Sequence, residues 1–403
     1  MRILQVHTRY RQAGGEDRVV AAEAEVLRAG GHEVEQVLAD NPAAPVATAA
    51  ALLRAPRNPA SRRDVEQAVA RFHPDVAHVH NTWYAQSPSI LDGLRASGVP
   101  TVMTVHNYRL MCVNGMLLRD GRPCEDCIGR SPLPGIRHRC YRNSVVASTV
   151  AAATIGYNRR RGTWDRTVDL YLAPTQFVRD RLLDGGFPAD RIRVKPHFVQ
   201  DPGPRRAPPS HSHTVLSVGR LSPDKGCHAL LDAWAALGDT ELELVFIGDG
   251  PLREELLRRR VPRVGFVGSV APEEVRSRML RARVLVATST WYETFGLVVA
   301  EAMAAGLPVI VPSGGALAEV AAGGAAVEPD NVETAGPAGD RLTMSLLRAL
   351  DYRVVDFAGS RGRDRFRALY SATVGLGRLV DTYRSAISTA DVDTSTDVGR
   401  AHK

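Results

Sequence analysis

Two glutamates, Glu293 and Glu301, stand on either side of the expected start of a helix, with seven residues between them. Val284 to Ala287 before them has the residue types of a buried strand, and Phe295 to Ala305 is rich in Ala, Leu and Met, as in a helix. We expect this helix to open near Thr294. Glu293 would then lie on the preceding loop and Glu301 about two turns into the helix.

The start of this helix is suited to bind an anion. The amides of Phe295, Gly296 and Leu297 would point outward with the positive end of the helix dipole, which favours a phosphate. Gly296 has no side chain to obstruct a ligand. A partly buried carboxylate needs hydrogen-bond donors, and the hydroxyls of a sugar or ribose are suitable ones. The alternative is that both glutamates are ordinary solvated side chains.

A second pair of charged residues, Arg220 and Lys225, lies about seventy residues earlier. His213 to Leu221 alternates as a strand does, and Cys227 to Leu237 has helical composition, so both cations would lie on one strand-to-helix loop. Arg is a forked donor to phosphate and Lys a compact point charge. Such a pair could stabilise a departing diphosphate without a metal ion, although loop cations are often only solvated.

The string WYETFGLVVAEAMAAGLP, Trp291 to Pro308, resembles the E-x7-E signature of the family-4 retaining glycosyltransferases. The G-R-x4-K-G element at Gly219 to Gly226 resembles the element with which that family holds the donor pyrophosphate. The resemblance implies an α/β fold of the GT-B type, with two doubly wound parallel-sheet domains facing a central cleft. It also implies that Glu293 binds hydroxyls of the sugar and Glu301 the ribose diol.

Three residues of the first half join this set because of their positions. Met1 to Thr8 is an expected strand followed by a loop with Gly14 and Gly15, and His106 ends the apolar stretch TVMTVH. Taken alone, two glycines indicate a tight turn, and a histidine at a strand end is usually structural. In the resembled family, the first loop and a histidine at this place belong to the site. We therefore expect Gly14 and Gly15 to bind the donor, and His106 to act in catalysis with Glu293.

Strands alternate with helices in both halves, as in parallel sheets covered on both faces. We expect an N-terminal acceptor-side domain at 1–200 with a cysteine-bearing insertion at about 107–145, and a nucleotide-sugar-binding domain at 213–370. The Pro- and Arg-rich residues 201–212 would link them. Residues 371–403 would form a C-terminal helix and a frayed tail. The helical pattern runs from Gly362 to Ser388, and the tail begins at about Thr389.

Length and composition fit two ordinary globular domains, with 403 residues, 44% hydrophobic and 24% charged. Met1 leads directly into a strand and no apolar run is long enough to span a bilayer, so we expect a cytoplasmic protein. Residues 1–200 carry 27 Lys and Arg against 19 Asp and Glu, whereas residues 201–403 carry 24 against 25. This asymmetry favours peripheral contact with an anionic membrane or a lipid-diphosphate acceptor, or is only a solvated face; no nucleic-acid motif accompanies it.

Four of the five cysteines fall in the same basic stretch, at Cys112, Cys124, Cys127 and Cys140. Four thiolates within 29 residues could form a tetrahedral structural zinc site, and an iron-sulfur cluster fits the same ligand count. The third interpretation is that the four cysteines are reduced, unpaired thiols, because the outer spacings are looser than in common zinc ribbons. Similar insertions in a subset of the resembled family support a structural role, and nothing in the expected chemistry requires a metal.

Together these patterns predict a retaining glycosyltransferase that moves a hexose-type sugar from a nucleotide diphosphate sugar to a glycan, lipid-linked or small-molecule acceptor. Polysaccharide or lipid-linked glycan assembly is the common setting of the resembled family. Two alternatives remain: a GT-B epimerase acting on the nucleotide sugar alone, and a non-catalytic glycosyltransferase-like partner subunit.

Overall fold

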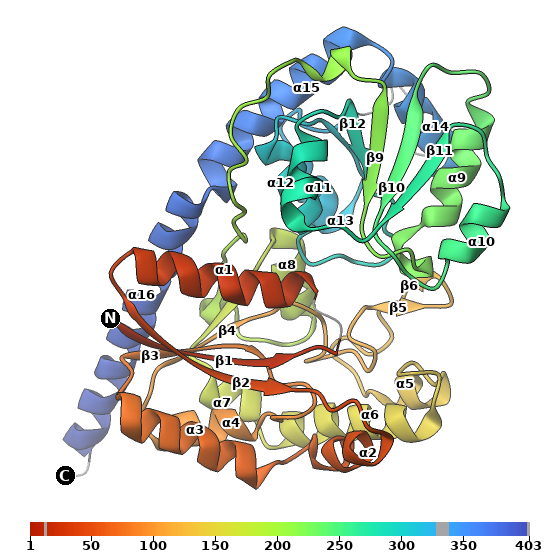
Figure 1. Cartoon of the computed structure of the whole chain (residues 1–403). Helices are drawn as coiled ribbons and strands as arrows, with labels where there is room; N and C mark the ends of the chain where they lie inside the picture. The colour runs from red at the N-terminus through yellow and green to blue at the C-terminus, as the bar shows by residue number, and fades with distance from the viewer. Residues whose placement is uncertain (12–13, 328–337, 401–403) are drawn as a thin grey trace. The chain divides into compact units, whose positions relative to one another are not determined.

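The computed structural model describes residues 1–11, 14–327 and 338–400. The chain forms two compact units, coloured by residue number in Figure 1. The first unit contains residues 1–119, 124–196 and 375 onwards, and the second contains 120–123 and 197–374. Each unit has its own parallel sheet, which confirms the predicted fold class.

The sheet of the first unit has six parallel strands in the order β2-β1-β3-β4-β7-β8. All residues of β3, β4 and β7 are buried, as expected for strands covered on both faces. The strands are β1 (Arg2–Arg9), β2 (Glu33–Asp40), β3 (Val76–Asn81), β4 (Thr101–Thr104), β7 (Leu170–Ala173) and β8 (Ile192–Val194).

Helices cover both faces of this sheet; Figure 1 shows α1 on one face and α3, α4 and α6 on the other. Between β4 and α6, regular structure is limited to the two-stranded ribbon of β5 (Leu118–Arg119) and β6 (Arg122–Pro123) and to the five-residue helix α5. The helices are α1 (Gly15–Ala29), α2 (Pro45–Arg54), α3 (Pro59–Phe72), α4 (Ser89–Ala96), α5 (Leu133–Arg137), α6 (Val145–Arg160), α7 (Thr163–Thr167), α8 (Gln176–Asp184) and, from residue 375, α16 (Ala372–Arg400).

The second unit has a five-stranded parallel sheet in the order β11-β10-β9-β12-β13. Its strands are β9 (Thr214–Val218), β10 (Glu243–Ile247), β11 (Val264–Gly268), β12 (Val284–Val286) and β13 (Val309–Ile310). Its helices are α9 (Cys227–Ala236), α10 (Arg253–Arg258), α11 (Pro272–Met279), α12 (Leu297–Ala304), α13 (Gly315–Ala321), α14 (Ala338–Arg348) and α15 (Tyr352–Arg365).

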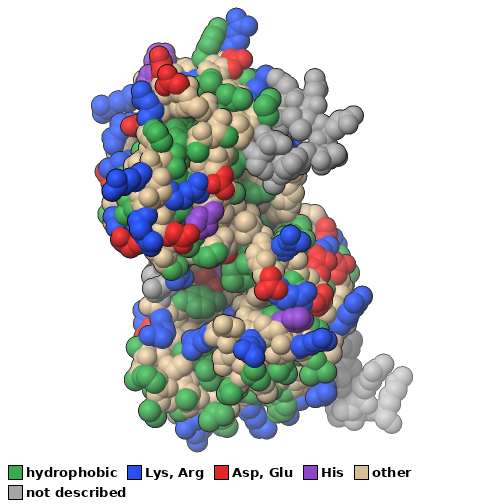
Figure 2. Space-filling model, turned by 90° about the vertical axis from the view of Figure 1, so that its right-hand side faces the viewer, with side chains coloured by type: hydrophobic (Ala, Val, Ile, Leu, Met, Phe, Trp, Pro, Cys, Tyr) green, Lys and Arg blue, Asp and Glu red, His purple; other side chains and the backbone are tan. Residues whose placement is uncertain are grey.

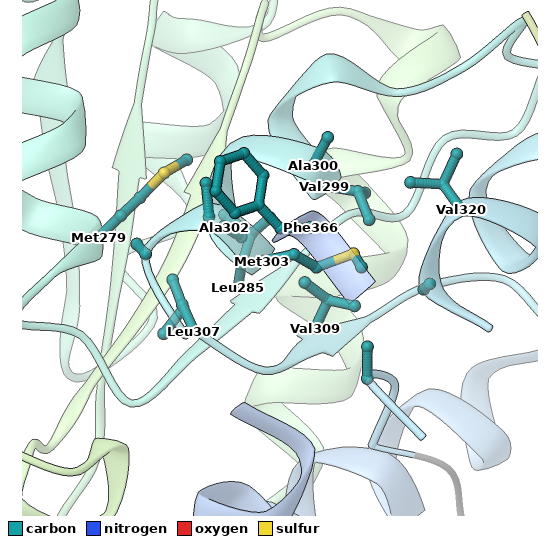
Figure 3. Packing of buried hydrophobic residues seen from close by; sticks show 14 of the residues in the cluster. Met279, Leu285, Val299, Ala300, Ala302, Met303, Leu307, Val309, Val320 and Phe366 are labelled. Atoms are coloured by element: carbon teal, nitrogen blue, oxygen red, sulfur yellow. The ribbon is translucent and has the colours of Figure 1, made fainter. Parts of the chain in front are cut away.

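Alternate residues of these strands enter two different cores. On β9, Val215 packs in the core with α9, and Leu216 packs in the core with α12. Figure 3 shows the second core, where Val299 and Met303 of α12 lie against Leu285 of β12 and other apolar side chains. Since Glu301 is the sole polar residue of α12, the core fixes the direction in which its carboxylate points.

Three predicted boundaries differ from the structure. Helix α12 begins at Leu297 rather than near Thr294, so Glu301 lies about one turn into the helix instead of two. Strand β4 ends at Thr104, so His106 lies two residues beyond it. The expected helix from Gly362 to Ser388 is two helices, because a π-helical turn at Phe366–Tyr370 and an extended Ser371 separate α15 from α16.

The expected tail and the expected linker also differ from the structure. The backbone is helical through Arg400, where we expected fraying from about Thr389. Within the expected linker 201–212, Arg205 donates to the carbonyls of Met279 and Ala282, at 3.0 and 2.6 Å, so this segment is fixed to the second unit. Among the described residues, no helix is long and apolar enough to cross a membrane.

Candidate functional site

Two loops at the carboxyl edge of the second sheet are bonded to each other. The loop after β9 carries Lys225, and the loop after β12 carries Glu293. Thr288 Oγ1 donates to the carbonyl of Lys225 at 2.9 Å, and the amide of Thr290 donates to the carbonyl of Asp224 at 2.9 Å. Because β9 and β12 are neighbours in the sheet, residues 63 to 68 positions apart in sequence meet at one edge.

This arrangement pairs the predicted cation with the predicted carboxylate. Lys225 Nζ donates to Glu293 Oε1, and Ser289 Oγ donates to the same oxygen at 2.8 Å. The Lys225 ammonium also lies 5.5 Å from the ring centroid of Trp291. The side chains of Lys225 and Glu293 are 30% and 14% exposed, so a ligand can reach both. An anion that binds Lys225 must share or replace this ion pair.

Two glycines make these contacts possible. Gly226 has φ +66°, and a Cβ there would lie 2.1 Å from the carbonyl oxygen of Thr288. Gly296, which precedes α12, has φ +87°, and a Cβ there would lie 2.2 Å from Leu317 Cδ2. Only glycine fits both positions. Both the close contact between the loops and the start of α12 therefore depend on residues without a side chain.

The remaining predicted donor residues surround this pair in sequence. Arg220 is exposed two residues after β9, and Glu301 is half-buried on α12. Leu297 is the first helical residue, so its amide and that of Gly296 lie at the positive helix end, as predicted. Phe295 precedes the helix, and its ring is in the core, edge-on to His197 and Tyr370.

In the first unit, the predicted glycine loop is tied to the sheet by carboxylates. Gly14 precedes α1, and its amide donates to Asp17 Oδ2 at 2.8 Å. The other oxygen of Asp17 is 2.9 Å from His7 Nε2 on β1. A Cβ on Gly14 would meet nothing closer than 4.0 Å, so this glycine leaves open space; Gly15 is the first residue of α1. Residues 12–13 of the loop lie outside the described residues.

His106 lies beside this loop within the same unit. Its neighbour Asn107 donates to Tyr10 Oη at 3.0 Å and to Glu16 Oε2 at 3.4 Å. Burial, followed by the nearby Asp17 carboxylate, raises the pKa of Glu16 well above its usual range. His106 and Asn107 also line a cavity of about 40 Å³, together with apolar residues that include Trp83. The structure thus brings His106 and the Gly14 loop together.

A buried polar network beneath His106 was missed from the sequence. His80 Nδ1 is 3.0 Å from His106 Nε2, and His78 Nδ1 is 2.8 Å from Tyr383 Oη. Glu23 is fully buried and forms an ion pair with the equally buried Lys195. The chain has three lysines but 48 arginines. The rare choice of lysine at position 195 was the signal in the sequence that could have pointed to a special environment.

Glu23, His78 and His80 form the one group among the described residues whose ligand atoms have metal-binding spacing, within 4.8 Å of one another. Lys195 already neutralises Glu23, however, and both nitrogens of His78 have hydroxyl partners, Tyr383 and, at 2.7 Å, Thr104. We therefore interpret this group as a hydrogen-bonded network.

The four cysteines of the insertion line one small cavity and form no disulfide. Burial, followed by the nearby Cys112 thiol, raises the pKa of Cys127 to about 11. Within the described part of the chain, no three of their sulfurs lie within 4.8 Å of one another. The cysteines converge, but a tetrahedral metal would have to draw them closer and displace their protons.

Two family models cover most of the chain. The model described as Glycosyltransferase Family 4 matches residues 13–201. The model described as Glycosyl transferases group 1 matches residues 212–372. The two matches meet between 201 and 212, close to the division between the two units.

Three curated relatives each match more than half of the chain. The phosphatidyl-myo-inositol mannosyltransferase of Mycolicibacterium smegmatis is 28% identical over 77% of this chain and 75% of that protein. A sulfoquinovosyl transferase of Arabidopsis thaliana is 30% identical over 62% of this chain but 45% of its own length. A GDP-mannose-dependent alpha-mannosyltransferase of Mycobacterium tuberculosis is 29% identical, over 62% and 58%. The chain thus spans about half the length of the latter two relatives.

Solved structures share the architecture at low sequence identity. HepE of Anabaena, crystallised with UDP and glucose, has a TM-score of 0.65 at 17% identity, covering 96% of this chain and all of that one. A glycosyltransferase of Rickettsia africae has a TM-score of 0.64 at 14% identity, with 96% and 98% coverage. These similarities show the GT-B fold, with two parallel-sheet α/β domains.

Proposed function

This chain belongs to glycosyltransferase family 4 and is a glycosyltransferase of the GT-B type, and we propose that it transfers a hexose from a nucleoside diphosphate sugar with retention at the anomeric carbon. The bond from the anomeric carbon to the diphosphate oxygen breaks, and a bond from the same carbon to an acceptor oxygen forms on the same face. The acceptor proton passes to the departing phosphate oxygen.

The ion pair of Lys225 and Glu293 is the observation that carries this proposal. It joins Lys225, which we assign to the diphosphate, to Glu293, which we assign to the sugar, on two loops bonded to each other through Thr288. Arg220 and the amides at the start of α12 add to the positive side, and Glu301 would take the ribose diol. A preorganised positive site stabilises the charge that develops on the leaving diphosphate.

In the first unit, we assign His106 to the transferred sugar and its diphosphate, and Gly14 and Gly15 to close approach of the donor. The open space at Gly14 and the position of His106 beside the same loop support this assignment. A His side chain near neutrality can orient a hydroxyl or stabilise developing charge.

Relatives support a hexose donor. Two of them are named mannosyltransferases, one of these GDP-mannose-dependent, and a structural neighbour was crystallised with UDP and glucose. We test this with purified protein, a panel of nucleoside diphosphate hexoses, and membrane extract as acceptor. Transfer to the extract, with an unchanged anomeric configuration in the product NMR spectrum, is the expected result. An inverted product would refute retention.

The same assay separates the two alternatives. A GT-B epimerase would change the sugar of the donor without any acceptor. A non-catalytic partner subunit would release nucleoside diphosphate no faster than the Glu293→Gln variant. We expect release that depends on acceptor and is lost in Glu293→Gln, but kept in Glu273→Gln, which alters an exposed glutamate on α11.

The acceptor, we propose, is presented at an anionic membrane surface. Three neighbouring helices of the first unit, α2, α5 and α6, share one apolar cluster on their inner sides. The chain there also exposes five aliphatic side chains: Val46, Leu53, Leu133, Val145 and Val146. Exposed arginines lie among them in sequence, at 54, 57, 137, 139 and 142. Figure 2 likewise shows hydrophobic and basic side chains interspersed over its visible face.

Exposed aliphatic side chains with surrounding arginines are suited to the headgroup region of an anionic bilayer. We expect sedimentation with phosphatidylglycerol vesicles but not with phosphatidylcholine vesicles. Leu53→Asp with Val146→Asp should abolish it, because these side chains are 75% exposed and would meet the lipid. Leu350→Asp, in the second unit and 47% exposed, is the control. Equal sedimentation of both variants would exclude this surface.

We also propose that the four insertion cysteines hold a structural metal ion, with zinc favoured by four thiolate ligands. The shared cavity and the absence of disulfides support the proposal. Residues 119–144, which contain three of the four cysteines, have little regular structure and few buried side chains, so a metal would stabilise this part as it does other small segments with little core.

A further inference from the structure

We infer that Glu23 and His80 are positioning residues for His106, and that they determine which nitrogen of the His106 imidazole carries the proton. The inference deepens the proposed function, because it rests on His106 lying against the sugar or diphosphate of the donor. All the residues involved belong to the first unit.

The contact between the two histidines is set by the sheet. His80 is near the carboxyl end of β3, and His106 lies two residues beyond β4, the neighbouring strand. His80 Nδ1 and His106 Nε2 are 3.0 Å apart, and the ring planes are tilted by 28°. Two ring nitrogens at this distance share one proton, so one of them donates and the other accepts.

Glu23 decides which nitrogen of His80 has the proton. The second nitrogen of His80, Nε2, is 3.7 Å from Glu23 Oε2. Both atoms are buried, and neither has a hydrogen-bond partner. A carboxylate oxygen can only accept, so the favourable arrangement places the His80 proton on Nε2, pointing to Glu23. A lone pair facing the carboxylate would leave two buried acceptors in opposition.

His80 has one ring proton rather than two. Burial, and then the neighbouring His78, lower the pKa of His80 well below its usual range, so the ring is neutral near pH 7. With the proton on Nε2, His80 Nδ1 is an acceptor, and His106 donates to it through Nε2. In neutral His106 the lone pair is therefore on Nδ1, which can accept a hydrogen bond from a hydroxyl of the donor sugar.

Lys195 neutralises the negative charge of Glu23. Its ammonium forms an ion pair with Glu23 Oε1, and both side chains are almost completely buried. The network thus orients His106 without adding net charge beside it. Other titratable groups facing the two histidines from neighbouring elements are His7 on β1, His78 on β3 and, through His78, Tyr383 on α16.

The first test exchanges the tautomers of His80 and His106 without changing the net charge of the buried network. In the full-length double variant Glu23→Gln with Lys195→Met, the glutamine amide can donate to His80 Nε2, which moves the His80 proton to Nδ1 and the His106 proton away from Nε2. Nitrogen-15 NMR of the histidine rings should show both tautomers exchanged. We expect kcat for sugar transfer to fall about tenfold, the worth of one oriented hydrogen bond, with KM changed much less.

A second pair of variants leaves Glu23 and Lys195 intact. The amide oxygen of His80→Asn can accept from His106 in place of Nδ1, whereas His80→Leu cannot. We expect the asparagine variant to retain activity and the leucine variant to lose about tenfold. This comparison decides the question if the double variant does not fold.

Two results would overturn the inference: a neutral His106 protonated on Nδ1 in the wild-type spectrum, or equal kcat in His80→Asn and His80→Leu. Failure of the proposed function would look different. Full activity of His106→Ala would remove His106 from the reaction, while the tautomers of the two rings in the unliganded protein would still be as assigned.

Discussion

Replacing Glu293 with glutamine removes one negative charge from the ion pair and leaves the shape of the side chain nearly unchanged. The two functions assigned to this site should then respond in opposite directions. Sugar transfer should fall, because the carboxylate no longer accepts from sugar hydroxyls. Binding of the nucleoside diphosphate alone should tighten, because Lys225 is freed from Glu293 and no anion remains beside the phosphate.

The expected size of the second effect follows from the burial of the pair. Glu293 is 14% exposed and Lys225 30%, so the effective dielectric constant lies between those of protein and water. At about 6 Å and an effective dielectric constant of about 40, a carboxylate repels a phosphate charge by about 1.4 kcal/mol. Glu293→Gln should therefore bind nucleoside diphosphate about tenfold more tightly at low salt, and less so at high salt.

Isothermal titration calorimetry with UDP and GDP measures this directly. Lys225→Met should lose affinity by about tenfold or more, because its cation is gone while the anion of Glu293 remains. Glu273→Gln, on the exposed side of α11, should match the wild type. If Glu293→Gln weakens diphosphate binding as much as Lys225→Met does, the pair is a structural strut and the donor site lies elsewhere.

Three further predictions concern stability and metal content. Gly226→Ala should lower the free energy of unfolding by about 2 to 4 kcal/mol, because the clash with Thr288 adds to the strain of the positive φ. Gly268→Ala, at φ +80° with open space, should lower it by about 1 kcal/mol. Urea denaturation of both variants measures the difference, and equal values would contradict the clash. Metal analysis should return about one metal per chain, lost when the insertion cysteines become serines; metal-free protein with four titratable thiols there would refute the site. Burial lowers the pKa of His78, so below about pH 6.5 only the unfolded state gains a proton there; the stability of the wild type relative to His78→Gln should fall by up to about 1.4 kcal/mol per pH unit, and a pH-independent difference would contradict a neutral His78.

The secondary structure of both units was largely readable from local patterns. Strands β1 and β12 fall within a residue of the predicted ranges, Met1 to Thr8 and Val284 to Ala287, because short apolar stretches between turn residues have few alternatives. The errors occur where tertiary contacts override local preference. Phe295 could occupy the first turn of α12, but its ring packs in the core beside Tyr370. The next residue, Gly296, has a positive φ that favours glycine, so the helix begins after it.

The candidate residues of the second unit were found because their types and order are distinctive, but their mutual contact could not be read from the chain. Nothing between Lys225 and Glu293 specifies that their loops are bonded; this depends on β9 and β12 being neighbours in the sheet. The buried network of the first unit shows the same limit. His78 and His80 have the two-residue spacing of one strand face, yet Glu23 and Tyr383 come from helices 55 residues before and 305 residues after.

The amino-acid sequence by itself determined the two α/β halves and a short set of charged and glycine residues that we propose bind the donor. These follow from local periodicity and side-chain chemistry. Tertiary structure alone decided that Lys225 is paired with Glu293, and that His106 contacts His80, which lies beside the buried ion pair of Glu23 and Lys195. The physical reason is that ion pairs and tautomers depend on distance in space, which strand order sets and sequence separation does not.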